Sequence, residues 1–428
     1  MNRLTVISSD GHAAARMPDY RPYMEPGYRD AFDDFVKVYE KHGVNATDPK
    51  ALLNRLDREM YDEWAEKAAA PGKLDGYWNP ERRLELLDQE GIAGEIIFQD
   101  VVTPFVLSTP SNASQDAIAP PSDDQLAAGR RAYNRWIADF ASTAPGRWRP
   151  LLAVSFEDVD AAIKEIRWAS EHGFAGVTLP VVPDTARIYQ AKYDPVYSAL
   201  EEYGLPLNAH TAISNSTPTY TGAPSRASAA AMIGNDMMVR AHQLLPQFIF
   251  GGVLARHPGL KLVLTEMQSD WVVGSLTKME HSFHHSALTR DIRDITPLSP
   301  REYWQRQCYL GSSLFSRAEI GARDTIGVDK MMLGMDVPHH EGSWWHGTEF
   351  YLRATLGAER VTEDEAKTML SRTAAGVFGF DLDKLARVAE RIGPATDQIL
   401  TPPADLSGAT TDSVHRGDLH RPLASAAH

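Results

Sequence analysis

Near its N-terminus the chain reads Leu4-Thr5-Val6-Ile7-Ser8-Ser9-Asp10-Gly11-His12, a short apolar run that ends in side chains able to bind a metal ion. Apolar runs that end in polar residues recur at 206–210, 261–266 and 330–336, and more weakly at 151–155 and 175–180. Runs of this length between helical stretches predict parallel strands buried on both faces. With two further runs, at 93–98 and 307–313, the pattern predicts an α/β protein, a distorted (β/α)8 TIM barrel.

Five polar side chains at the ends of these runs are expected to lie close together. The C-terminal ends of all strands open on one face of a parallel barrel. This places Asp10, His12, His210, Glu266 and Asp336 at one mouth. Two histidines with carboxylates form a donor set for a hard or borderline divalent cation. The Asp-Gly pair alone would also fit an ordinary turn, so the prediction depends on the whole set.

Composition excludes several classes of partner. The 428 residues carry a formal charge of −14, and nucleic-acid binding depends on clustered lysine and arginine, so we expect no nucleic-acid partner. No signal peptide and no uninterrupted apolar stretch of ~18 residues are evident, so we expect no membrane association. The single cysteine, Cys308, excludes an intramolecular disulfide and fits a reducing compartment. We therefore expect a cytoplasmic protein that acts on a small molecule.

The chain is predicted to form one barrel domain, residues 1–395, followed by an extended arm or disordered tail at 396–428. The end of the chain is polar and proline-containing and has no periodicity. Three long insertions, at about 13–80, 99–123 and 211–226, are expected over the C-terminal face. Loops of this length inside a compact domain usually shape a functional site.

Several motifs resemble those of a known family. They are Asp10-Gly11-His12, His210, the run GGVLARHPGLKLVLTE at 251–266, Tyr303-Trp304, GMDVPHHEG at 334–342 and Phe378-Gly379-Phe380-Asp381. Together they resemble the amidohydrolase-related family of the metal-dependent amidohydrolase superfamily. The similarity is to the branch that includes aminocarboxymuconate-semialdehyde decarboxylase and related hydrolases.

This resemblance implies one divalent ion, most often Zn²⁺ with Mn²⁺ or Fe²⁺ as alternatives, held by Asp10, His12, His210 and Asp336. Asp336 would also handle the proton of a metal-bound water, whose pKa falls from about 15.7 towards ~7. No lysine ends the run at 176–180, which argues against the carbamylated-lysine bridge of dinuclear relatives. The resemblance, together with the apolar-rich helix expected at 227–250, also suggests a homodimer.

Glu266 departs from the family pattern, because decarboxylating relatives place a histidine at this position. A carboxylate near a cation is normally ionised, so it would serve better as a base, a metal ligand or a water-orienting group than as a proton donor. A glutamate paired with arginine or lysine at the barrel rim is the structural alternative.

We therefore expect a mononuclear metal-dependent hydrolase with Asp336 and Glu266 as catalytic residues and His339 in support. The first alternative is a metal-dependent non-oxidative decarboxylase of an aromatic or enoic acid. The second is a catalytically silent barrel that only binds a ligand. His340 is expected to be solvated or structural, and the helical histidines His281, His284 and His285 to lie at a surface or an interface.

Overall fold

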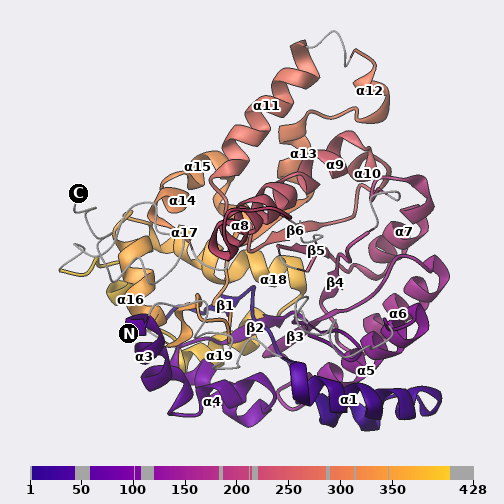
Figure 1. Ribbon diagram of the computed structural model, residues 1–428. Coiled ribbons are helices and arrows are strands. Elements are labelled where there is room, and N and C mark those ends of the chain that lie inside the picture. Colours follow the sequence, from indigo (N-terminus) through magenta and orange to yellow (C-terminus); the bar gives the residue numbers. More distant parts are fainter. Residues whose placement is uncertain are drawn as a thin grey trace.

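The computed structural model describes residues 2–43, 58–100, 102–107, 120–182, 187–211, 213–214, 220–285, 290–312, 315–345 and 347–404. Within these ranges eight parallel strands form one sheet in the order β1 to β8 (Figure 1). The strands are β1 (Ile7–Ser8), β2 (Gly94–Ile97), β3 (Trp148–Leu152), β4 (Gly176–Thr178), β5 (Leu207–His210), β6 (Leu262–Thr265), β7 (Cys308–Ser312) and β8 (Met331–Leu333). The predicted (β/α)8 barrel is confirmed.

Backbone hydrogen bonds close the barrel between β8 and β1. Ser9 N donates to Leu333 O at 2.6 Å, and Asp336 N donates to Asp10 O at 3.0 Å. Beyond the strands, Gly11 and Val337 form a parallel bridge. The segments that carry Asp10 and Asp336 therefore run side by side out of the barrel.

Alternate residues of each strand face opposite sides of the barrel wall. Ile7, Ile96, Leu151, Val263 and Met332 come from five strands and pack into one buried cluster, which fills the interior of the barrel. Their strand neighbours, such as Leu262 and Leu264, instead join the larger cluster under the surrounding helices. This alternation is the period of two expected for strands buried on both faces.

The helices surround the barrel, except that α11 and α12 project beyond it (Figure 1). The helices named up to α9 are α1 (Arg29–His42), α3 (Arg58–Trp64), α4 (Pro80–Gln89), α5 (Asp123–Ser142), α6 (Val159–Glu171), α7 (Asp194–Tyr203), α8 (Arg226–His242) and α9 (Leu244–Phe250). The remainder are α10 (Val253–Arg256), α11 (Trp271–His285), α12 (Ile292–Ile295), α13 (Pro300–Gln307), α14 (Arg317–Gly321), α15 (Arg323–Ile326), α16 (Thr348–Leu352), α17 (Glu363–Lys367), α18 (Thr373–Phe378), α19 (Leu382–Ile392) and α20 (Thr396–Ile399).

The first insertion is more ordered than its proline content suggested. It contains α1, α3 and a 3-10 turn at Met17–Tyr23, and its Tyr20, Phe32 and Trp64 are fully buried in the main core. The insertion is held to α5 by Tyr23, whose hydroxyl donates to Asp139 at 2.9 Å. Apolar side chains spaced for helices, and not the prolines, therefore decide the structure of this region.

Parts of the predicted insertions and tail lie outside the described residues, namely 44–57, 101, 108–119, 212, 215–219 and 405–428. The start of the predicted tail, at α20, is helical and attached to the N-terminus, because Thr396 N donates to Asn2 O at 3.0 Å. The division into domain and tail stays a prediction. In the described part of the chain, no helix combines the length and apolar character required to span a bilayer.

Candidate active site

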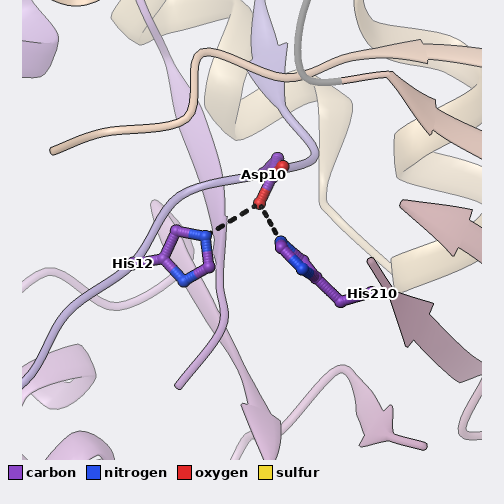
Figure 2. Close-up of side chains that lie close together, drawn as sticks. All are labelled: Asp10, His12 and His210. Carbon is purple, nitrogen blue, oxygen red and sulfur yellow. Dashed lines mark ion pairs between the residues drawn. The ribbon is translucent and has the colours of Figure 1, made fainter. Parts of the chain in front are cut away.

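Three of the predicted metal ligands meet at the C-terminal mouth of the barrel. Asp10 and His12 follow β1, His210 is the last residue of β5, and Figure 2 shows both imidazole rings turned towards the Asp10 carboxylate. Nε2 of His12 and Nε2 of His210 each lie 3.5 Å from Oδ1 of Asp10. All three side chains are buried.

The fourth predicted ligand, Asp336, lies beside them. It follows β8, is fully buried, and its Oδ1 is 3.4 Å from His12 Nε2. Its backbone amide donates to Asp10 O at 3.0 Å, which holds Asp336 beside the segment that follows β1. Asp10, His12 and His210 form one group of possible ligands, and Asp336 joins this group through His12 in a second group that also contains His339.

The spacing of these atoms suits a shared cation better than direct hydrogen bonds. Ligand atoms about 2.1 Å from a tetrahedral ion stand about 3.4 Å apart. The nitrogen to oxygen distances are 3.4 to 3.5 Å, too long for good hydrogen bonds. Within the described residues, Nε2 of His12 and both ring nitrogens of His210 have no hydrogen-bond partner. Buried polar atoms are normally satisfied, so the donor set fits a divalent metal ion.

Glu266 lies just beyond β6 at the edge of this cluster. Its carboxylate is 24% exposed, and its Oε2 is 3.4 Å from His210 Nδ1. Glu266 and Asp336 both have a φ of 55°, in the left-handed region that non-glycine residues adopt at a cost. Among the described residues no arginine or lysine forms an ion pair with Glu266, which disfavours the rim-pairing alternative.

The environment of Glu266 favours its protonated form. Burial raises the pKa of Glu266 well above its usual value, and the negative charges of Asp336, Asp10 and Glu341 raise this pKa further. His339 acts in the opposite direction but does not outweigh them. Two of the carboxylates that raise this pKa, Asp336 and Asp10, are themselves predicted metal ligands.

His339 connects the ligand cluster to a residue that sequence reasoning missed. Its Nδ1 is 2.9 Å from Asp336 Oδ1, and its Nε2 is 3.8 Å from Asp100 Oδ2. Burial by itself would lower the pKa of His339, but Asp336 and Asp100 outweigh burial and hold this pKa well above its usual value. The ring of His339 stacks on His12 with centroids 4.2 Å apart, so His339 covers one side of the cluster.

Asp100 is buried three residues beyond the end of β2 and accepts a hydrogen bond from Tyr77 of the first insertion. Asp100 falls within the predicted insertion at 99–123. Its place after a strand nevertheless matches the pattern by which the other ligands are predicted. Burial would raise the pKa of Asp100, but its interactions with His339 outweigh burial and lower this pKa. Asp100 is thus an ionised partner that keeps His339 protonated.

The other histidines behave as expected. Nδ1 of His340 is 2.6 Å from Oε2 of Glu341, so His340 has a structural ion pair. His281, His284 and His285 are exposed on the projecting helix α11 (Figure 1). Of these, His284 is paired with Glu280 on the same helix, with 3.1 Å between Nε2 and Oε2.

Proteins of known sequence or structure resemble this chain. The gamma-resorcylate decarboxylase of Rhodococcus jostii (strain RHA1) is 24% identical over 289 residues, which cover 63% of this chain and 84% of the relative. The crystal structure of an amidohydrolase from Mycobacterium avium subsp. paratuberculosis K-10 aligns with a TM-score of 0.60 at 18% identity, covering 89% of this chain and 100% of that chain.

A 5-carboxyvanillate decarboxylase from Novosphingobium aromaticivorans DSM 12444 aligns with a TM-score of 0.57 at 17% identity, covering 88% of this chain and 96% of that chain. That enzyme was crystallised with manganese and 4-hydroxy-3-methoxy-5-nitrobenzoic acid. At these identities the structural matches support the barrel fold.

These comparisons contradict the expectation of a hydrolase. The curated relative and the manganese-containing enzyme are decarboxylases, which agrees with the alternative and not with the main prediction. The sequence does not separate the two reactions, because both use the same metal ligands and differ in what the groups around Glu266 do to a proton, which depends on the fold. Burial and the carboxylates of Asp336, Asp10 and Glu341 raise the pKa of Glu266.

A family model extends the match over most of the barrel. The model of the amidohydrolase family matches residues 105–380, more than half of the chain. This range begins before α5 and ends after α18, so it includes the strand ends that carry His210, Glu266 and Asp336. The chain belongs to the amidohydrolase family.

Proposed function

We propose that this protein is a metal-dependent, non-oxidative decarboxylase of an aromatic acid. The proposal depends on four buried side chains that can bind a metal ion, Asp10, His12, His210 and Asp336, and on a neighbouring glutamate, Glu266, whose pKa is raised. The decarboxylase activity of the relatives supports the same reaction.

The metal proposed here is one divalent ion per chain. The two histidines and two aspartates would hold this ion. When present, the ion would bind the substrate carboxylate and a neighbouring oxygen atom. Four side chains alone would complete a tetrahedral Zn²⁺ site, whereas binding two substrate oxygens as well requires a six-coordinate ion such as Mn²⁺, which the Novosphingobium enzyme contains. We therefore propose Zn²⁺ or Mn²⁺, to be distinguished by elemental analysis of protein purified without chelator.

Glu266 is assigned as the proton donor. In the proposed reaction its carboxyl proton passes to the ring carbon that bears the carboxylate, so a carbon to hydrogen bond forms. The bond to the carboxylate carbon then breaks, its electron pair returns to the ring, and carbon dioxide leaves. Glu266 is regenerated by a proton from solvent, which its 24% exposure allows.

The protonated His339 has a supporting role. Its ring packs on His12 and its Nδ1 contacts Asp336, so it keeps two of the proposed ligands in place. Its positive charge also offsets part of the negative charge of the surrounding carboxylates. Asp100 keeps His339 protonated from the opposite side.

The test is a panel of hydroxybenzoates incubated with metal-loaded enzyme in deuterium oxide. Decarboxylation releases carbon dioxide and places one deuteron on the ring carbon that lost it. In a parallel reaction in oxygen-18-labelled water, a product that carries oxygen from the water, formed without release of carbon dioxide, would contradict the proposal.

We also propose the oligomeric state and the cellular location of the protein. A homodimer is supported by α8, whose Val239 is 54% exposed and whose Met232, Met237 and Met238 are only half-buried. A cytoplasmic location is supported by the single cysteine.

A further inference from the structure

A fully buried ion pair lies directly behind the proposed metal ligands. Arg83 of α4 and Glu95 of β2 are both 0% exposed. The guanidinium binds the carboxylate through two hydrogen bonds, Nε to Oε2 at 3.0 Å and Nη2 to Oε1 at 2.8 Å. Burying two charges costs free energy even when they are paired, and apolar residues often fill such a space equally well. Packing alone therefore does not account for a buried ion pair at this position.

The remaining donors of Arg83 point at the two segments that carry the ligands. Nη1 donates to the carbonyl of His12 at 3.1 Å, and Nη2 donates to the carbonyl of Val337 at 3.2 Å. His12 is a proposed ligand, and Val337 immediately follows another, Asp336. The Val337 carbonyl also accepts the His12 amide at 2.6 Å, so one guanidinium joins both segments where they pair.

Gly11, between Asp10 and His12, is needed because of this pair. A Cβ at this position would lie 2.5 Å from Glu95 Oε1 and 2.9 Å from Arg83 Nη2. Its backbone is not in the left-handed region, so close approach and not conformation requires glycine here. The main chain between the two ligands thus rests directly on the ion pair.

We infer that the Arg83–Glu95 pair is a positioning device that sets the distance between the ligand segments after β1 and β8 and thereby the affinity of the site for its metal. Arginine suits this role because its planar fork can bind a carboxylate and two carbonyls at once, which a lysine ammonium cannot do in the same geometry. The inference rests on the metal site of the proposed function.

The test is Arg83→Lys, which keeps the buried charge but loses the fork. Partners that orient ligands usually change metal affinity by about 10- to 100-fold, and we expect the Zn²⁺ dissociation constant to rise by that factor. It would be measured by competition with a chromophoric chelator on the full chain. The visible spectrum of the Co²⁺-substituted protein should also change, because it reports the coordination geometry.

Arg256→Lys is the matched control. Arg256 also binds one carboxylate through two hydrogen bonds, that of Asp194, and two carbonyls, those of Gly251 and Tyr189, and none of these residues belongs to the proposed metal site. The loss of these hydrogen bonds should lower the unfolding temperature of the variant protein. Its Zn²⁺ dissociation constant and its Co²⁺ spectrum should stay unchanged.

Gly11→Ala is a second perturbation that removes no charge. The added methyl should displace the pair, weaken Zn²⁺ binding and alter the Co²⁺ spectrum, and it keeps the inference testable if Arg83→Lys fails to fold. Unchanged affinity in a folded Arg83→Lys or Gly11→Ala protein would overturn the inference while leaving the proposed function intact. A wild-type protein that binds no divalent metal would overturn both.

Discussion

Glu266→Gln tests the proton donor directly. The amide keeps the size and polarity of the side chain but has no acidic proton to transfer. Positioned acids contribute about 10²- to 10⁴-fold, or roughly 3 to 5 kcal/mol at 1.36 kcal/mol per tenfold change. Glu266 is 24% exposed, so solvent can reach the same space and protonate the ring slowly. We therefore expect a loss near the lower limit, about 10²-fold in kcat.

The assay is single-turnover release of carbon dioxide, with metal content measured on the same samples. The pKa of Glu266 is raised and its protonated form reacts, so the wild-type kcat should fall as pH rises through this pKa. The Gln variant should lack that decrease. Glu201→Gln is the control, because the Glu201 side chain is also 24% exposed and lies beside a histidine, His257, outside the candidate site.

Two results would refute the reasoning about Glu266. If Glu266→Gln reduced kcat no more than Glu201→Gln does, the proton would come from another group. If Glu266→Gln lost its metal, Glu266 would be a ligand, and its effect on the rate would say nothing about proton transfer.

The remaining predictions concern the metal, pH and assembly. Elemental analysis should find about one divalent ion per chain, and two ions, or none after reconstitution, would contradict this expectation. The His210→Ala variant should lose metal and activity yet keep the circular dichroism spectrum of the wild type. In metal-free protein, the raised pKa of His339 gives a stabilisation that is complete below its ordinary value of 6.5 and is lost as pH rises through the folded value. Urea unfolding should show this loss in wild type but not in His339→Gln. Light scattering at micromolar concentration should give the mass of a dimer, and a monomer mass would exclude that assembly.

The strand-end pattern predicted most of the fold and much of the candidate site from sequence alone. A parallel barrel brings the C-terminal ends of its strands to one face, so apolar runs that end at Asp10, His210 and Asp336 are enough to predict their convergence. Helix starts are also marked locally. Thr362 is followed by three acidic residues at the start of α17, and its side chain accepts a hydrogen bond from Glu365 N in a capping box. The wider turn at Thr368–Arg372 that follows α17 has no such local signal.

Properties that depend on contacts distant in sequence required the tertiary structure. The raised pKa of Glu266 depends on its burial and on carboxylates that are distant in sequence, and no local pattern reveals either. Asp100 acquires its role only because His339, more than 200 residues later, lies 3.8 Å away. The Arg83–Glu95 pair joins α4 to β2 and supports the segments after β1 and β8, with no motif to mark it. Electrostatic energies depend on the distance between charges and on their burial, and folding alone determines both.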